Sequence, residues 1–315
     1  MNYFNLSFLL STFLVAARAA ENIKWTDVKS SGKDDAQRLS NTHVRVQRGR
    51  TLKIASVMNT TGLRDVHFKL EGTLQVEPNL GYWAGNAFPI PYQKNSAIWL
   101  FGGENIVLDG GGTIDGSGQT WWDARPSNAT LIPPLMLVVH QARNVRISNT
   151  TFYKTPKWAN LVQESQDVVY EHITVDSVSN STADMRETDG WDTYRSNGVT
   201  IRDSVIHNGD DCVSFKPSEW IYYNGIGLLS SAFADSTNII VRNLQCNESH
   251  GVSVGSLGEI DGVKDVVQNI FVDSVTMSNS ENGVRIKTFA GQNRGYGIVD
   301  NIIYTNFHND NNDYP

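Results

Sequence analysis

Four short clusters of polar residues carry side chains suited to acid–base chemistry. They occupy positions 188–192, 208–212, 249–251 and 285–287 and read Thr-Asp-Gly-Trp-Asp, Asn-Gly-Asp-Asp-Cys, Ser-His-Gly and Arg-Ile-Lys. Carboxylates crowded on one surface push each other's pKa values apart, so that one stays protonated as a general acid while others remain ionised. Hydrolysis of a glycosidic bond requires such a pair, and a neighbouring guanidinium and ammonium would hold an anionic sugar.

The candidate residues follow directly from these types. Asp189, Asp210, Asp211 and His250 are candidates for proton transfer, and the two cations at 285 and 287 are candidates for binding a carboxylate. Each cluster alone has an ordinary interpretation as a turn, a structural histidine or a solvated strand face. The functional interpretation is favoured because all four recur at similar intervals along the chain.

A repeated pattern indicates the elements that would position these side chains. An Asn or Asp repeatedly precedes a short strand with alternating apolar residues, and helical periodicity is almost absent. These lead-in residues are Asp65, Asn105, Asn144, Asp167, Asn197, Asn238, Asn269 and Asn301. Such self-similarity predicts an all-β solenoid, here a parallel β-helix. A β-sandwich is the alternative, but its strands have no reason to share one lead-in residue.

The intervals between the clusters match single coils of this solenoid. Asp189 and Asp210 are 21 residues apart, and Asp210 and His250 are 40 apart, or 22 if an 18-residue segment at 218–235 is discounted. Consecutive coils of a β-helix are stacked about 4.8 Å apart, so residues one coil apart become neighbours.

Strand alternation predicts which side chains face outward. In the stretch 284–287, alternation points Val284 and Ile286 into the core and Arg285 and Lys287 outward on one face. In the stretch 212–216 the same rule buries the residues at 213 and 215. The sequence therefore predicts one outward patch that combines three carboxylates, an imidazole and two cations.

The segment 218–235 interrupts the repeat. It contains Gly225 and Gly227 and lacks strand alternation. Removing its 18 residues shortens the interval from Asn197 to Asn238 from 41 to 23, which equals the interval from Asn144 to Asp167. We interpret it as an insertion or a translated, unspliced intron. A surface loop is the alternative, because loop closure entropy grows slowly with length.

The N-terminus predicts export. An apolar run from 8 to 17 ends in Ala-Arg-Ala, which is typical of a signal peptide over residues 1–19, leaving one domain over 20–315. The run is too short to span a membrane. Five acceptor sequences for N-glycosylation support a secreted, extracellular protein, at Asn59, Asn128, Asn149, Asn180 and Asn247.

Composition excludes several classes of protein. The 315 residues are 40% hydrophobic and include 26 Gly, 9 Pro and 2 Cys, so the chain is neither disordered, collagenous nor disulfide-rich. Its 26 basic and 33 acidic residues give a formal net charge of −7 without a basic run. A nucleic-acid partner is therefore not expected, nor is a membrane partner, and we expect a monomer.

The polar clusters also carry a family resemblance. TDGWDTYRS, NGDDCVSFK, SHGVSVGSLG and RIK resemble, in this order, the signature motifs of glycoside hydrolase family 28, the polygalacturonases, and GGTIDGSGQTWWD at 111–123 is similar to an early coil of that family. The continuation WDTYRS resembles fungal exo-acting members more than endo-acting ones. The resemblance implies a single-stranded right-handed parallel β-helix and inverting hydrolysis of α-1,4-galacturonosyl linkages in pectin, without metal or cofactor.

Residue roles follow from the matching motifs. Asp210 would be the general acid, with Asp189 and Asp211 activating water. His250 would tune or shuttle protons, and the cations at 285 and 287 would bind the galacturonate carboxylate. Cys212 and Cys246 lie on adjacent predicted coils of an exported protein, which favours a disulfide, and the family pairs the corresponding cysteines.

The sequence departs from the family in two places. Glu187 stands where the first motif usually has Asn, which adds an acid beside the predicted site. The chain also stops one strand after Asn301, whereas the family continues, so the resemblance implies a C-terminally truncated β-helix with an uncapped terminal coil.

Several functions remain open at this level. The leading hypothesis is exo-acting galacturonan hydrolysis, and the nearest alternatives are an endopolygalacturonase or a rhamnogalacturonan or xylogalacturonan hydrolase. A pectate lyase would need a calcium-binding carboxylate cluster and a Lys or Arg base. An inactive pectin-binding paralogue is the third class, suggested by Glu187 and the early end of the chain.

Overall fold

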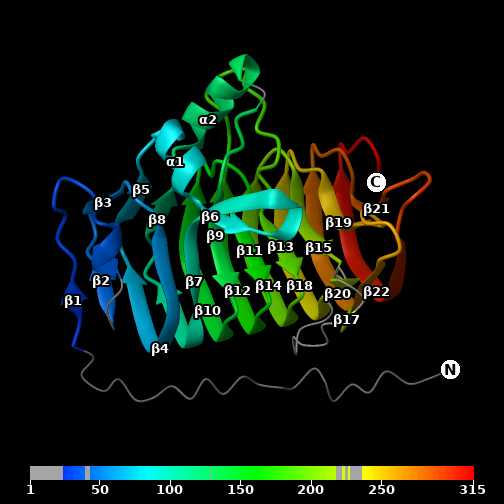
Figure 1. The fold of residues 1–315 in the computed structure, drawn as a ribbon, viewed down its shortest axis with the longest axis horizontal. Helices are drawn as coiled ribbons and strands as arrows, with labels where there is room; N and C mark the ends of the chain where they lie inside the picture. The colour runs from blue at the N-terminus through cyan, green and yellow to red at the C-terminus, as the bar shows by residue number, and fades with distance from the viewer. Residues whose placement is uncertain (1–23, 40–42, 129, 218–221, 224–225, 228–235) are drawn as a thin grey trace.

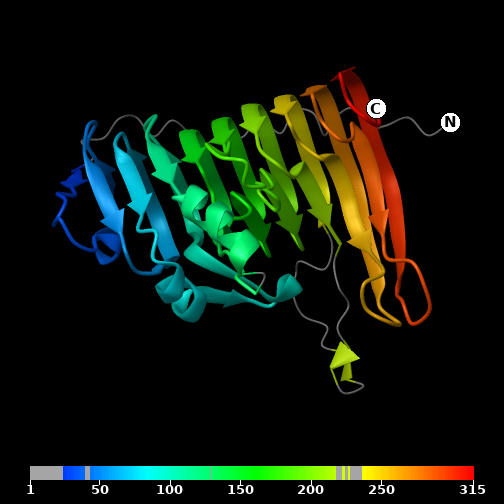
Figure 2. The same ribbon diagram turned by 90° about the horizontal axis from the view of Figure 1, so that it is seen from above.

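Strands of successive coils lie side by side and run parallel along the solenoid (Figures 1 and 2). The computed structural model describes residues 24–39, 43–128, 130–217, 222–223, 226–227 and 236–315. These residues form a parallel β-helix, as the sequence predicts. The predicted signal peptide at 1–19 lies outside the described residues.

The strands stack in three ladders. The short-strand ladder starts on β7 and continues through β9 (Leu135–His140), β11 (Asn160–Gln163), β13 (Trp191–Tyr194), β15 (Asp211–Lys216), β19 (Gly251–Leu257) and β21 (Val284–Thr288). The long-strand ladder contains β4 (Met58–Leu70), β7 (Asn95–Asp109), β10 (Arg143–Tyr153), β12 (Gln166–Asp176), β14 (Asn197–His207), β18 (Ser236–Asn247), β20 (Lys264–Ser278) and β22 (Tyr296–Asp310). A third ladder of β3 (Thr51–Ile54), β5 (Thr73–Val76) and β8 (Thr113–Asp115) joins the end of β10.

Strands β1 (Thr26–Asp27) and β2 (Val44–Val46) extend the long-strand ladder beyond β4. The remaining elements lie outside the three parallel ladders. They are β6 (Phe88–Ile90), β16 (Tyr222–Tyr223), β17 (Ile226–Gly227), helices α1 (Leu80–Asn86) and α2 (Gly118–Ala124), and the 3-10 turns η2 (Ala36–Leu39), η3 (Tyr92–Lys94) and η4 (Arg125–Ser127). Helices α1 and α2 lie together on one side of the coils (Figure 1). In the part of the chain that the structure describes, no helix has the length and apolar character needed to cross a bilayer.

The repeated Asn or Asp before each strand has a conformational cause. Seven of the eight lead-in residues adopt the left-handed backbone region, with φ between 54° and 57°, and in the coil of Asn197 the neighbouring Gly198 does so at φ 73°. Asn, Asp and Gly tolerate this region better than other residues. The side chains also stack between coils, since Asn144 Nδ2 donates to Asn105 Oδ1 at 2.7 Å. The repeat therefore marks one turn that is built again in every coil.

Alternation along these strands fills the interior. The buried cluster includes the fully buried side chains of Trp99, Trp191 and Phe215. Cys212 on β15 and Cys246 on β18 form a disulfide across this interior, with their Cα atoms 6.1 Å apart. The predicted cysteine pairing is confirmed.

Alternation fails as a predictor of burial in β21. Val284 and Ile286 point toward the interior side of their strand, but they are 38% and 61% exposed, so the expectation that they are buried is wrong. Strand β21 pairs with β19 on one side, and among the described residues no further strand of its ladder covers the other. An inward-facing residue is buried only when coils lie on both sides of it.

Two further predictions fall on peripheral parts of the chain. Of the segment 218–235 the structure describes β16 and β17, a small antiparallel pair that stands away from the solenoid strands (Figure 2). Four of the five predicted glycosylation residues are exposed, whereas Asn247 is half-buried. The amide of Asn247 is engaged on both sides, because Oδ1 accepts from Asn279 and Nδ2 lies 2.9 Å from His207 Nε2.

Candidate active site

The predicted acids and His250 lie at the start of neighbouring strands in the short-strand ladder, and Arg285 and Lys287 lie within β21. Asp211 begins β15 and is in register with Gly251, the residue after His250. Ser253 on β19 is in register with Arg285 on β21. Strand β13, which follows Asp189, pairs with β15, so the register places four consecutive coils under the site, as the spacing of the motifs predicts.

Asp210 and His250 form a contact pair. His250 Nδ1 lies 3.1 Å from Asp210 Oδ1, which also accepts the backbone N–H of Asp211 at 2.9 Å. Asp210 Oδ2 accepts the backbone N–H of Glu187 at 2.8 Å. Burial raises the pKa of Asp210, but the hydrogen bond and charge of His250 and these N–H groups outweigh it and lower the pKa to about 2. The same hydrogen bond raises the pKa of His250.

Asp211 is held by the two predicted cations. Arg285 Nη2 donates to its Oδ1 at 2.9 Å, and Lys287 Nζ contacts its Oδ2. Ser253, which lies between the strands that carry these residues, donates its hydroxyl to the same Oδ1 at 2.6 Å. Burial opposes charge on Asp211, but the Lys287 and Lys216 ammonium groups lower its pKa. Asp211 is therefore ionised, and Arg285 and Lys287 are held on the outward face.

Asp189 has the opposite electrostatic character. Its side chain is buried, and burial together with the charges of Asp192 and Asp210 raises its pKa well above the usual range. Lys216 Nζ lies 3.9 Å from its Oδ2 and 2.9 Å from Asp192 Oδ1. Lys216 is itself buried and sits 4.7 Å from the centre of the Trp158 ring.

The three predicted acids form a single cluster. One carboxylate oxygen from each of Asp189, Asp210 and Asp211 lies within 4.8 Å of the others. Their environments differ, because burial and like charges favour a proton on Asp189 while cations favour charge on the other two. Such a cluster titrates as a unit and can hold one proton among ionised partners. The structure thereby brings all six predicted site residues into one patch.

Glu187 is neutralised where it departs from the family pattern. Its carboxylate pairs with Arg125 of η4 and with Lys157 Nζ, the latter at 3.2 Å. Burial opposes its charge, but the cations of Lys157 and Arg125 lower its pKa. Glu187 thus adds an acid beside the site, and two cations compensate its charge. Its two partners lie 62 and 30 residues before it in the chain, so local sequence carried no signal for them.

A crossing segment covers the face of the solenoid on the N-terminal side of the site. Strand β6 pairs with the start of β7, and Figure 1 shows it lying across β9, β11 and β13. Ile90 and Tyr92 pack on outward side chains of these strands, and the Tyr92 ring stacks on Tyr194 with centroids 4.2 Å apart. Lys157 Nζ also donates to Asn95 Oδ1 at 2.7 Å. This hydrogen bond connects the crossing segment to the ion pairs that Arg125 and Lys157 form with Glu187, which we call the clamp.

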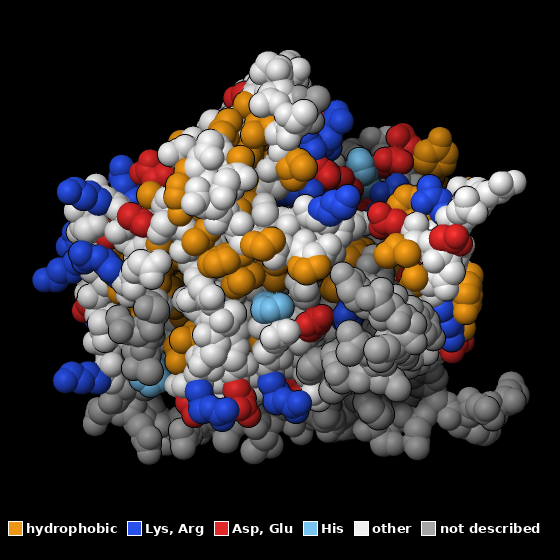
Figure 3. All heavy atoms as spheres, in the orientation of Figure 1, with side chains coloured by type: hydrophobic (Ala, Val, Ile, Leu, Met, Phe, Trp, Pro, Cys, Tyr) orange, Lys and Arg blue, Asp and Glu red, His pale blue; other side chains and the backbone are white. Residues whose placement is uncertain are grey.

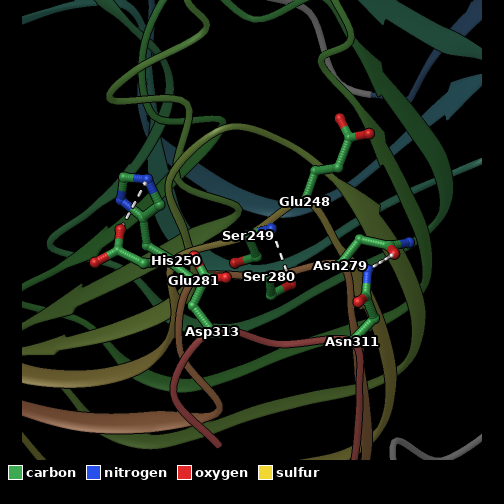
Figure 4. A pocket seen from close by; sticks show the side chains of 8 residues that line it. All are labelled: Glu248, Ser249, His250, Asn279, Ser280, Glu281, Asn311 and Asp313. Carbon is green, nitrogen blue, oxygen red and sulfur yellow. Dashed lines mark hydrogen bonds and ion pairs between the residues drawn. The ribbon is translucent and has the colours of Figure 1, made fainter.

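A hollow lies beside the site, toward the coils that follow it in the chain. This hollow of about 410 Å³ adjoins His250 (Figure 4) and is lined by Glu248, Ser249, His250, Asn279, Ser280, Glu281, Asn311 and Asp313. Glu281 Oε2 lies 3.4 Å from His250 Nε2, so the hollow borders the acid cluster. Figure 3 shows acidic and basic side chains gathered on this part of the surface, beside the projecting helix α2.

Sequence reasoning missed Asp192, Lys216 and Ser253 as members of the site. A signal for Lys216 was available, because alternation from the buried Val213 and Phe215 places residues 214 and 216 on the outward face. The fold and this site define a β-helical protein with a cluster of three carboxylates, an imidazole and two cations on its outward face. The chain belongs to Glycosyl hydrolases family 28, which matches residues 36–315.

Individual relatives support this membership. The chain is 36% identical to the "Exopolygalacturonase" of Cochliobolus carbonum, over 90% of this chain and 64% of that protein. It is 34% identical to the "Probable exopolygalacturonase X" of Aspergillus fumigatus, over 90% of this chain and 66% of that protein. The chain therefore spans slightly less than two thirds of these relatives.

Solved structures show the same fold. The endo-xylogalacturonan hydrolase of Aspergillus tubingensis superposes with a TM-score of 0.78 at 28% identity, covering 91% of this chain and 74% of that one. The polygalacturonase of Erwinia carotovora ssp. carotovora superposes with a TM-score of 0.70 at 21% identity, covering 90% of this chain and 76% of that one. The latter likeness concerns the fold alone.

Proposed function

We propose that this protein is an exo-acting glycoside hydrolase that cleaves α-1,4-galacturonosyl linkages of pectic galacturonan. The observation that carries the proposal is the cluster of Asp189, Asp210 and Asp211 within 4.8 Å, beside Arg285 and Lys287. The acids suit proton transfer to and from a glycosidic bond. The cations suit a uronate, whose carboxylate would exchange with Asp211 as their partner.

The protonation states of the acids in the cluster constrain the mechanism. By their positions in the family motifs, Asp210 would donate the proton, and Asp189 and Asp211 would activate the water. Asp210 is ionised in the free site, so the proton must reach it before the glycosidic bond breaks, and His250 at 3.1 Å is the nearest donor. In this scheme His250 gives its proton to Asp210, Asp210 protonates the leaving oxygen, and the attacking water loses its proton to a carboxylate that is ionised at that moment.

The exo mode is supported by the asymmetry of the site. The crossing segment at 88–95 packs over the solenoid face on the N-terminal side of the site. It would keep a polymer from lying across that part of the face, so that a chain end would enter the site. Relatives at 34–36% identity are named exopolygalacturonases, which agrees with this mode.

The stereochemical outcome is a separate proposal. Inverting enzymes hold their carboxyl groups about 6.5–9.5 Å apart, and retaining enzymes about 5–5.5 Å apart. The 4.8 Å found here joins single oxygens and is not a separation of whole carboxyl groups, so the motifs carry the assignment, and they favour inversion. We propose inversion on the motifs. Proton NMR of the first product tests it: the β-anomer appears first on inversion and the α-anomer on retention.

Incubation with oligogalacturonates followed by product chromatography tests the activity. Monomer from the first time point indicates exo action, and a ladder of oligomers indicates an endopolygalacturonase. The Asp210→Asn variant controls for contaminating activity. Faster release from xylogalacturonan or rhamnogalacturonan would assign the substrate differently, and binding without release would indicate an inactive pectin-binding paralogue.

A calcium-dependent pectate lyase is the second candidate, because three carboxylates in reach of one another resemble a cation site. The donor set fits poorly, since both oxygens of Asp211 and both oxygens of Asp210 already have partners. A lyase would release unsaturated products that absorb in the ultraviolet and would lose activity with a chelator. We propose catalysis without metal or cofactor.

Export and processing complete the proposal. We propose secretion through cleavage of residues 1–19 and glycosylation of the exposed acceptor asparagines, and a monomeric protein in solution. Expression in a secreting host, N-terminal sequencing for Ala20 and a mass shift on deglycosylation test the first two. Light scattering tests the third.

A further inference from the structure

We propose that Glu187 is a positioning residue, whose clamped carboxylate fixes its own backbone so that its N–H holds the Asp210 carboxylate. The inference rests on the proposed function, because it assigns a role within the same site. It concerns a residue that departs from the family motif and that does not itself belong to the acid cluster.

The side chain of Glu187 is fixed from two directions. Arg125, in the turn after α2, and Lys157, in the turn before β11, both pair with its carboxylate. Lys157 is buried and donates a hydrogen bond to Asn95, which fixes its position. If the Glu187 side chain moved, Lys157 could not move with it, and the ion pair would be lost. Three segments distant in sequence thereby determine the position of one side chain.

The backbone of Glu187 is held in an unusual conformation. Its φ is 61°, in the left-handed region that a glutamate adopts less readily than Gly or Asn. Such a conformation persists when the surrounding structure over-determines it, and residues of this kind cluster at active sites. The ion pairs with Arg125 and Lys157 hold Glu187 in this conformation.

The consequence of this conformation lies at Asp210. In the left-handed conformation the Glu187 N–H points at Asp210 Oδ2 and donates at 2.8 Å. The other oxygen of Asp210 faces His250 and the Asp211 N–H. Glu187 therefore fixes the orientation of the carboxyl group that is proposed to donate the proton. The carboxylate held by Arg125 and Lys157 and the N–H that binds Asp210 belong to the same residue.

Substitutions at Glu187 distinguish the role of its backbone conformation from the role of its carboxylate. Gly adopts positive φ without a clamp, whereas Ala retains the conformational cost and lacks the clamp. We expect Glu187→Ala to lower kcat on trigalacturonate at least about tenfold with KM changed less than threefold, because an interaction that orients the acid is lost. Glu187→Gly should recover at least fivefold of that loss, and Glu187→Asn should behave like Gly.

A remote glutamate provides the matched control. Glu164 also has positive φ, at 50°, and pairs with Arg195, but it follows β11 and does not contact the acid cluster. Glu164→Ala and Glu164→Gly should alter the melting temperature without changing kcat by more than twofold. If they reproduce the Glu187 series, the effect is one of general stability and the proposal is wrong.

The clamp is tested from its other side. Lys157→Gln should lower kcat in the wild-type background but not in the Glu187→Gly background, where no clamp is needed. Equal rates for Glu187→Ala and Glu187→Gly, or a loss confined to KM, would overturn the proposal. Absence of hydrolysis by the unmodified protein on every galacturonan would instead refute the proposed function, so the two failures are distinguishable.

Discussion

Replacing Lys216 by methionine removes a cation from the most deeply buried ionic group of the site. Its Nζ lies 2.9 Å from Asp192 Oδ1 and 3.9 Å from Asp189 Oδ2, and the side chains of all three are at most 5% exposed. Methionine has nearly the same length, so packing against Trp158 changes little. Loss of one partner from a buried ion pair costs about 3–5 kcal/mol. We expect Lys216→Met to lower the free energy of unfolding by that amount at pH 8.

The loss should depend on pH with a defined sign. Burial raises the pKa of Asp192 to about 6, against the opposing effect of Lys216, so without the lysine the pKa rises further. A carboxyl whose pKa is raised by folding binds more protons in the folded than in the unfolded state, so stability falls as pH rises toward the folded pKa. The deficit of Lys216→Met should therefore be smaller at pH 5 than at pH 8.

A double-mutant cycle in urea provides the assay. Lys216→Met combined with Asp192→Asn removes both charges, and replacing a buried pair by neutral groups is often close to neutral. The double variant should recover about 2 kcal/mol or more relative to Lys216→Met alone. Strict additivity of the two single variants, or a deficit that grows on acidification, would refute the electrostatic argument.

Four further predictions address catalysis, binding, pH and the inserted segment. Asp210→Asn should lower kcat at least about 100-fold while oligogalacturonate binding by calorimetry persists; a residual tenth of the wild-type rate would exclude a role in proton transfer. Arg285→Ala and Lys287→Ala should raise KM for oligogalacturonates, and methyl-esterified oligomers should be poor substrates of the unmodified protein, so equal rates on both substrates would contradict the carboxylate assignment. His250→Gln should lower the melting temperature most between about pH 4 and 6, because the raised pKa of His250 and the lowered pKa of Asp210 make their pair charged in that window and lost as pH rises through the histidine pKa. Sequencing of transcripts should show a majority species without codons 218–235; uniform retention would exclude the intron.

The repeating part of the molecule was predictable because its cause is local. Each coil needs a residue that tolerates positive φ before a strand, and the lead-in Asn and Asp residues meet this requirement. The coils can therefore be recognised from these residues alone. Once one residue per coil is identified, stacking fixes the neighbours of every other position. The motif spacing alone therefore places Asp189, Asp210, Asp211 and His250 together.

The partners of these acids were less predictable because they come from outside the repeat. Arg125 follows a helix that interrupts the coils, and Lys157 precedes β11 in a turn without a regular pattern. Nothing in the residues adjacent to Glu187 indicates that two cations reach it. Alternation likewise mispredicted the burial of Ile286, because burial depends on a covering coil and not on the direction of the side chain alone.

The irregular segments also bear on how a polymer reaches the acids. A bare solenoid presents the same outward face along its whole length, so a chain could bind anywhere on it. The crossing segment at 88–95 removes that symmetry by packing Ile90 and Tyr92 over strands on the N-terminal side. The same segment supplies Asn95 to the lysine that clamps Glu187. If exo action is confirmed, the segment that covers the face on the N-terminal side is thus physically joined to the feature that orients the proposed acid, and a change in the crossing segment should alter both product pattern and turnover.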